Sequence, residues 1–104
     1  LDLLKSFSGS DDMISPAITG LIGDCYVNMG NVKEGISYFE KAAKSADNEV
    51  ISPIYLKKAG IAYESLQQYA DAVKSYTQIK EKYFNSMEAA DIDKYIARAT
   101  ALAK

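Results

Sequence analysis

The sequence predicts an all-α protein built from a repeated pair of helices. Two stretches carry this prediction, SPAITGLIGDCY from Ser15 and SPIYLKKAGIAY from Ser52, because both place Ser-Pro, Gly and Tyr at the same internal spacing, 37 residues apart. Apolar residues follow each Ser-Pro at the intervals of an amphipathic helix, and no stretch alternates apolar and polar residues as a half-buried strand does. A repeat of this length indicates stacked helical units, a solenoid, with one continuous core.

Each Ser-Pro pair is expected to start the first helix of a unit. Serine caps an unpaired backbone N–H, and proline fits the first helical position, where its missing N–H has no cost. The apolar stripe of the first unit is expected at Ile18, Ile22, Cys25, Tyr26 and Met29. The matching stripe of the second unit is Tyr55, Ala59, Ala62, Tyr63 and Leu66.

A turn and a second amphipathic helix are expected in each unit. Gly30-Asn31 is a turn signature because both residue types tolerate a positive φ, and Gln67-Gln68 is a weaker form of it. The second helices carry their apolar residues at Ile36, Phe39, Ala42 and Ala43, and at Val73, Tyr76, Ile79 and Tyr83.

The two ends of the chain complete the stack. A fifth helix is expected after an N-cap at Ser86, with an apolar face of Ile92, Tyr95, Ile96, Ala99 and Leu102. It resembles the capping helix that a solenoid needs over its last repeat. We therefore divide the chain into residues 1–14, the end of a truncated preceding repeat with its link, residues 15–51 and 52–85, the two helix–turn–helix repeats, and residues 86–104, the capping helix.

The opening LDLLKSF predicts the last part of an amphipathic helix. Leu1, Leu4 and Ser8 share a face at helical spacing, with Leu3 and Phe7 beside it. The chain also begins without an initiator methionine, so we expect a fragment of a longer protein. Any targeting segment or membrane anchor would then lie upstream, and the compartment stays open between the cytoplasm and the cell envelope.

Composition narrows the possible partners. The 104 residues carry a net charge of -2, and no basic cluster is present to favour a nucleic acid. No apolar run is long enough to span a bilayer, so we expect no membrane contact by this domain itself. The single cysteine cannot form an internal disulfide. Three of the eight tyrosines, Tyr26, Tyr63 and Tyr76, are expected in the repeat core rather than on a base-stacking surface.

We expect no catalytic residue, no cofactor and no metal. The chain has no histidine, the commonest general base and zinc ligand. Cys25 lies on an apolar stripe, where a buried small residue is the simpler interpretation. Asp91 and Asp93 point to different sides of a helix and do not form a pair. The segment GNVKEG lacks the spacing of a phosphate-binding loop.

The doubled pattern resembles the tetratricopeptide repeat, in the style of bacterial members of that family. The first helices match through Ile22-Gly23 with Tyr26, and through Ala59-Gly60 with Tyr63. The turns and second helices supply Gly30, Gly35, Phe39 and Ala42, then Gln67, Ala72, Tyr76 and Ile79. Thr19 departs from the family pattern, Gly35 and Ile79 stand where the family usually has alanine, and neither unit ends in the usual proline.

The resemblance implies a non-catalytic module that binds a peptide or a helix of a partner protein in a concave groove lined by the first helices, as a scaffold or adaptor in an assembly. The groove residues it implies are Asp24, Val27, Asn28, Lys57, Ile61, Glu64, Asp91, Lys94 and Arg98. The carboxylate clamp of some members is not carried over, because its positions hold Gly20 with Asp24 and Lys57 with Ile61. The alternative is self-association through the ends of the stack, as a homodimer or longer solenoid, within a membrane-anchored envelope protein.

Overall fold

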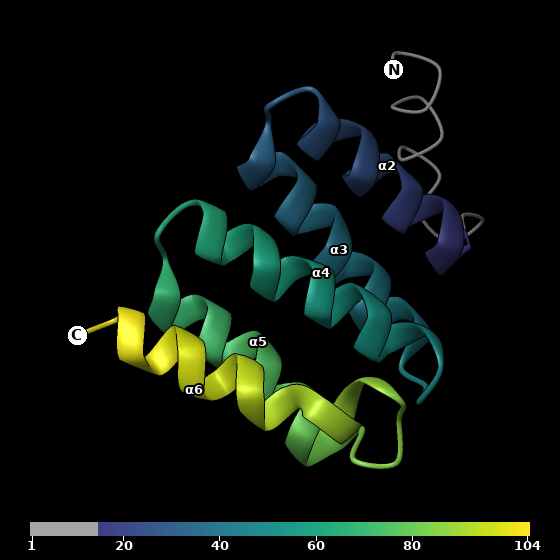
Figure 1. Cartoon of the computed structure of the whole chain (residues 1–104). Coiled ribbons are helices and arrows are strands. Elements are labelled where there is room, and N and C mark those ends of the chain that lie inside the picture. The colour runs from purple at the N-terminus through teal and green to yellow at the C-terminus, as the bar shows by residue number, and fades with distance from the viewer. Residues whose placement is uncertain (1–14) are drawn as a thin grey trace.

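The computed structural model describes residues 15–104, and this part of the chain is all-α, as predicted (Figure 1). It contains α2 (Pro16–Asn28), α3 (Val32–Ala46), α4 (Ile51–Ser65), α5 (Tyr69–Lys82) and α6 (Ile92–Leu102), with a 3-10 turn η2 (Glu88–Asp91) before α6. The expectations for the opening segment, a helix end at Leu1–Phe7 and a polar link to residue 14, lie outside the described residues.

Each helix packs against the next along the chain, α2 on α3, α3 on α4, α4 on α5 and α5 on α6. The result is a flat stack of 40 × 29 × 15 Å (Figure 1). Two helix pairs, α2–α3 and α4–α5, form the repeats, and α6 closes the C-terminal end. The predicted architecture of two helix–turn–helix units and a capping helix is confirmed.

The two intra-repeat turns form where the sequence places them. Gly30 has a φ of +87° and Gln67 a φ of +61°, so each repeat reverses direction through a left-handed residue. Glycine adopts this conformation without cost, whereas Gln67 does so with a side chain present. The N–H groups of Asn31 and Gln68 donate to the carbonyl oxygens of Tyr26 and Tyr63, which closes both turns in the same way.

Small residues let the helices of each repeat approach closely. A side chain at Gly23 would meet the ring of Phe39, and one at Gly60 would meet the ring of Tyr76. The aromatic ring of the second helix therefore fills the space that the glycine of the first helix leaves open. The repeated glycine and aromatic positions therefore pack against each other within one repeat.

Most of the predicted apolar positions are buried, including all four on α3, Tyr76 and Ile79 of α5, and Tyr83 directly after α5. Others are partly buried, and three are exposed, namely Ile18, Met29 and Leu102, whose exposed fractions are 41%, 59% and 52%. Ile18 and Met29 belong to the first helix of the described stack, and no helix among residues 15–104 covers that side of α2. The prediction of these three residues as core was wrong for the described stack.

The two Ser-Pro pairs play different parts, which corrects the prediction for the second. Ser15 caps α2 by accepting from the Ile18 N–H at 3.3 Å. Helix α4, however, begins at Ile51, so Ser52 lies inside its first turn. The Ser52 hydroxyl is fully buried, donates to the Ala43 carbonyl oxygen at 2.7 Å and accepts from the Asn48 N–H at 3.0 Å.

Asn48 provides the cap that the sequence assigned to Ser52. Its side-chain oxygen accepts from the N–H groups of Val50 at 2.9 Å and Ile51 at 2.7 Å. The helix therefore starts earlier than the Ser-Pro signature indicates, and proline occupies the third helical position rather than the first.

The C-terminal helix begins later than predicted. Ser86 does act as a cap, since its hydroxyl accepts from the Ala89 N–H at 3.2 Å, but the turn that it caps is η2. Helix α6 starts only at Ile92, with Asp91 at its N-cap position. Asp91 is therefore a residue of the turn into α6 rather than of its exposed face.

Candidate protein-binding surface

The first helices α2 and α4 are connected by an ion pair across the repeat boundary. The ammonium group of Lys58 lies 3.0 Å from both carboxylate oxygens of Asp24. Both side chains are partly exposed, so the pair lies at the surface and is screened by solvent. The same ammonium lies 5.9 Å from the ring centroids of Phe39 and Tyr55. Asp24 thus already has a partner within the chain.

Helices α4 and α6 are connected by a tighter set of contacts centred on Glu64. Arg98 donates from Nε to Oε2 at 3.1 Å and from Nη2 to Oε1 at 2.8 Å, and the Tyr76 hydroxyl donates to Oε1 at 2.7 Å. The Glu64 side chain is only 13% exposed. Burial acts to raise the pKa of Glu64, but the hydrogen bonds from Arg98 and Tyr76 outweigh it and hold this pKa below its ordinary value.

The ring of Tyr95 on α6 brings two cations together. The Lys57 ammonium lies 4.5 Å from the ring centroid and the Arg98 guanidinium 4.9 Å from it. The ring of Tyr76 packs against Tyr95 at 5.5 Å, so the site rests on the core. Unlike Arg98, Lys57 has no carboxylate partner among residues 15–104.

Two large apolar side chains stay exposed on α4 beside Lys57. Ile61 is 47% exposed and Ile54 37% exposed. Residues three and four apart lie on one side of a helix, so Ile54, Lys57 and Ile61 form a continuous strip. We call the exposed sides of α2, α4 and α6 the first-helix face. Asn28 and Lys94 are exposed on α2 and α6.

Comparison with protein-family models identifies both repeats independently. Residues 20–49 match one tetratricopeptide-repeat model and residues 56–86 match another. The chain belongs to the tetratricopeptide-repeat family. Comparisons with curated proteins and with solved structures find no match. Tetratricopeptide repeats are a non-catalytic interaction fold that generally mediates protein–protein contacts and scaffolding.

The tetratricopeptide unit also explains where the groove candidate Val27 and the clamp position Gly20 lie. Val27 is half-buried and packs toward α3, because a side chain at Gly35 would meet the Val27 methyl group. Gly20 is covered by the ring of Tyr55 from the next repeat. These positions contribute to packing within and between repeats. Asp91, at the turn into α6, is exposed.

The structure thus brings some of the sequence-predicted residues together and separates others. Lys57, Glu64 and Arg98 meet around Tyr95 and Tyr76, whereas Asp24 pairs with Lys58 at the α2–α4 boundary. The sequence did not indicate Ile54, Lys58 or Tyr95 as residues of this surface. Ile54 could have been found from its seven-residue spacing to Ile61, which places both on one side of α4.

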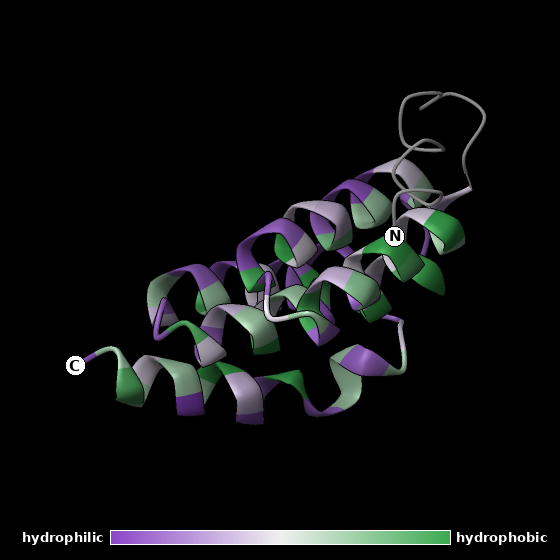
Figure 2. Cartoon of the chain, turned by 90° about the horizontal axis from the view of Figure 1, so that it is seen from above, coloured by the Kyte–Doolittle hydropathy of each residue, from purple (hydrophilic) through white to green (hydrophobic). Residues whose placement is uncertain are grey.

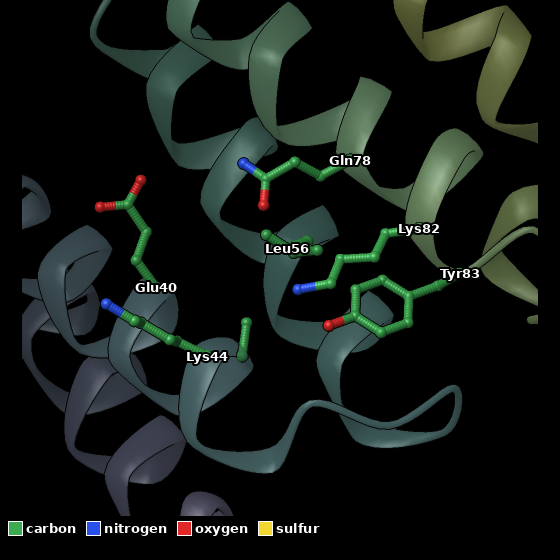
Figure 3. A pocket seen from close by; sticks show the side chains of 7 residues that line it. Glu40, Lys44, Leu56, Gln78, Lys82 and Tyr83 are labelled. Atoms are coloured by element: carbon green, nitrogen blue, oxygen red, sulfur yellow. The ribbon is translucent and has the colours of Figure 1, made fainter.

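The second helices carry a hollow of a different kind. It has a volume of about 350 Å³ and lies between α3 and α5 over Leu56, with Glu40, Lys44, Gln78, Lys82 and Tyr83 around it (Figure 3). Charges of both signs surround it, and Lys82 is paired with Asp47 at 3.4 Å. None of the nine groove candidates lines this hollow.

Residues 15–104 show neither a cluster of metal-ligating side chains nor a helix long and apolar enough to cross a bilayer.

Proposed function

We propose that this tetratricopeptide domain holds an extended peptide or a helix of a partner protein on its first-helix face, as a scaffold component. The observation that carries the proposal is the strip Ile54–Lys57–Ile61, where two exposed apolar side chains flank a cation. Exposed apolar groups beside a fixed charge are typical of surfaces that anchor a partner. The ion pairs on either side of the strip hold α2, α4 and α6 in place before binding, which lowers the ordering cost.

The strip also indicates the chemistry of the partner. Two isoleucines accommodate apolar side chains, and the Lys57 ammonium, held over the Tyr95 ring, is free to meet a carboxylate. Glu64 and Arg98 neutralise each other, and Asp24 is neutralised by Lys58. The partner segment we expect therefore presents apolar residues with an acidic residue between or beside them.

The test is a peptide selection followed by affinity measurements. Peptides selected from a random displayed library against the full chain are titrated against the native protein, Ile61→Asp and the control Leu102→Asp. Leu102 is comparably exposed, at 52%, but lies at the end of α6. We expect Ile61→Asp to weaken binding at least tenfold, or about 1.4 kcal/mol, and Leu102→Asp to leave it unchanged.

Two outcomes would count against this proposal. Peptides that bind Ile61→Asp as tightly as the native protein would move the binding surface elsewhere. Amide chemical-shift changes confined to α3 and α5 would place it over the hollow between the second helices. Circular dichroism of each variant separates loss of binding from loss of helix.

A further inference from the structure

No helix among residues 15–104 covers the outer side of α2, at the first end of the stack. Ile18, Leu21 and Met29 are 41%, 51% and 59% exposed there, and Cys25 lies between them, half-buried. The four residues recur at intervals of three and four, so they share one side of the helix. We call them the α2 stripe. In Figure 2 the first half of α2 is coloured as strongly apolar.

The second repeat uses the same four positions to contact the first. Counted 37 residues on, the α2 stripe corresponds to Tyr55, Lys58, Ala62 and Leu66. Tyr55 covers Gly20 and Lys58 pairs with Asp24, both on α2. Ala62 and Leu66 pack in one cluster with residues of α3. These positions form an interface between units, which is the role we expect of the α2 stripe.

The near absence of charge on α2 restricts the surfaces that can cover the α2 stripe. Asp24 is the one charged residue of α2, and Lys58 pairs with it at 3.0 Å. A helix that is apolar on nearly all sides is typically buried. An uncharged neighbour suits it, because a charged group packed against the α2 stripe would lose its water without gaining a partner.

The α2 stripe of a second copy is an uncharged surface of this kind. Helix α6 closes the other end of the stack, and its exposed residues include Asp93, Lys94 and Arg98. The exposed isoleucines of α4 flank Lys57, and charges of both signs surround the hollow between α3 and α5. Packing the α2 stripe on any of these surfaces would bury charge, whereas packing it on a second α2 stripe buries none.

The spacing of the α2 stripe is self-complementary in an antiparallel pair of α2 helices. With the two-fold axis between Leu21 and Cys25, Ile18 lies opposite Met29 of the second copy, and Leu21 lies opposite its Cys25. A large side chain then meets a small one at the centre of the seam. The positive end of each helix dipole also lies beside the negative end of the other, and the first and last turns of α2 carry no charged side chain.

We propose that two copies of this chain form a two-fold symmetric dimer through antiparallel packing of their α2 stripes. Such an interface uses the same surface of both copies, so it closes at two copies and does not grow into a filament. One helix–helix seam is smaller than a standard protein interface, and the dimer is therefore weak and depends on concentration. The proposal goes beyond the proposed function, because the strip Ile54–Lys57–Ile61 is not part of this interface and stays open for a ligand.

The mass of the full chain in solution tests the dimer. Analytical ultracentrifugation covers concentrations from about 1 µM to about 1 mM, the range of weak dissociation constants. We expect the native mass to rise from 11.4 kDa toward twice this value. Leu21→Asp should raise the dissociation constant at least tenfold. The control Leu102→Asp, at a position 52% exposed at the end of α6, should leave it unchanged.

Cross-linking through Cys25, the only cysteine of the chain, tests the register. In the proposed pair the two Cys25 Cα atoms are about 8–10 Å apart, from the rise of an α-helix and the separation of packed helices. A short bismaleimide should therefore link the native chain into a covalent dimer. The control Cys25→Ala, Thr100→Cys carries its one thiol on exposed α6 and should give at least fivefold less covalent dimer.

Four results would overturn the proposal. A native mass that stays at one chain at every concentration excludes a second copy, including the case in which other residues of the chain cover the α2 stripe. A mass that grows past two copies indicates head-to-tail association. A dimer that Leu21→Asp leaves intact uses another surface, and equal cross-linking through Thr100→Cys contradicts the register.

Two further measurements keep the interpretation clear. Circular dichroism of Leu21→Asp separates loss of the dimer from loss of helix. Peptides that bind the strip Ile54–Lys57–Ile61 should bind Leu21→Asp as tightly as the native chain, so failure of the dimer and failure of the proposed function are distinguishable.

Discussion

Arg98 on α6 and Glu64 on α4 are joined by two hydrogen bonds, although 34 residues separate them in the chain. Asp24 and Lys58 are joined across the same number of residues. Charge pairs therefore connect α2 with α4 and α4 with α6 on the first-helix face, where we propose that a partner binds. Glu64, Arg98 and Asp24, which the sequence assigns to ligand contact, are thus paired within the stack, and the partner contact we propose falls on Lys57 and the exposed isoleucines.

Replacing Arg98 should loosen the capping helix. In Arg98→Met the side-chain length is kept, but Glu64 loses both hydrogen bonds from the guanidinium while remaining mostly covered. We expect the free energy of unfolding to fall by about 1 kcal/mol, the upper end for a partly exposed pair. Urea denaturation measures it, and hydrogen exchange should show faster opening of α6.

The control for this variant is Lys80→Met. Lys80 pairs with Asp93 between α5 and α6 at 2.7 Å, but both side chains are largely exposed, at 56% and 75%. We expect a clearly smaller loss of stability there. Equal losses in the two variants would mean that the Glu64 contacts add nothing beyond an ordinary surface pair.

The stability of the domain should fall in acid, in part through Glu64. The pKa of Glu64 lies below its ordinary value of 4.5 in the folded chain and returns to it on unfolding. The ionised carboxylate therefore stabilises the fold fully above that ordinary value, and the stabilisation is lost as the pH falls through the folded pKa. In Glu64→Gln, urea midpoints between pH 7 and pH 3 should fall less than in the native chain.

Asp47 offers a parallel measurement. The hydrogen bond from Tyr83 and the charge of Lys82 lower the pKa of Asp47. In Asp47→Asn the urea midpoint should therefore also fall less between pH 7 and pH 3 than in the native chain. A native pH dependence retained in both variants would contradict the assigned roles of these carboxylates.

The fold was predictable because its determinants are local and repeated. Gly23 with Phe39 and Gly60 with Tyr76 recur at one spacing, and close helix packing requires a small residue opposite each ring. Periodicity could not separate the core from an interface between repeats, however. Ile18 and Met29 have the spacing of core residues, yet whether they are covered depends on a neighbouring unit.

The surface was less predictable because it depends on helix rotation and on where each helix begins. Lys57 and Lys58 are adjacent in the sequence, and only the three-dimensional packing decides that Lys58 reaches Asp24 while Lys57 lies over Tyr95. Val27 occupies the position in the first repeat that Glu64 occupies in the second. Gly35 has no side chain, however, and this leaves space for Val27 to pack against α3. The family pattern, which has alanine at the position of Gly35, does not predict that Val27 packs toward α3.

Gly35→Ala should destabilise the domain even though alanine is the usual residue of the family there. A Cβ atom at Gly35 would lie 2.8 Å from the Gly23 carbonyl oxygen and would also meet Val27. Because one of these contacts is with backbone, α2 and α3 must move apart, and we expect a loss of about 1–3 kcal/mol. Chemical denaturation measures it, with exposed Ser37→Ala on the same helix as the control. A more stable Gly35→Ala would show that the helices separate easily.

Ser52→Ala should cost more than Ser15→Ala, although the sequence presents both serines in the same Ser-Pro motif. Ser52 is fully buried, and removing its hydroxyl takes one hydrogen bond from the Ala43 carbonyl oxygen and one from the Asn48 N–H. The Ala43 oxygen still accepts from the Asp47 N–H, so the Asn48 N–H is the group that loses its partner, and an unpaired group at a covered position costs about 1–3 kcal/mol. Ser15 makes only an exposed cap at 3.3 Å, for which about 0.5–1 kcal/mol is expected. Thermal unfolding of the two variants decides the order, and a larger loss in Ser15→Ala would contradict the bridging role of Ser52.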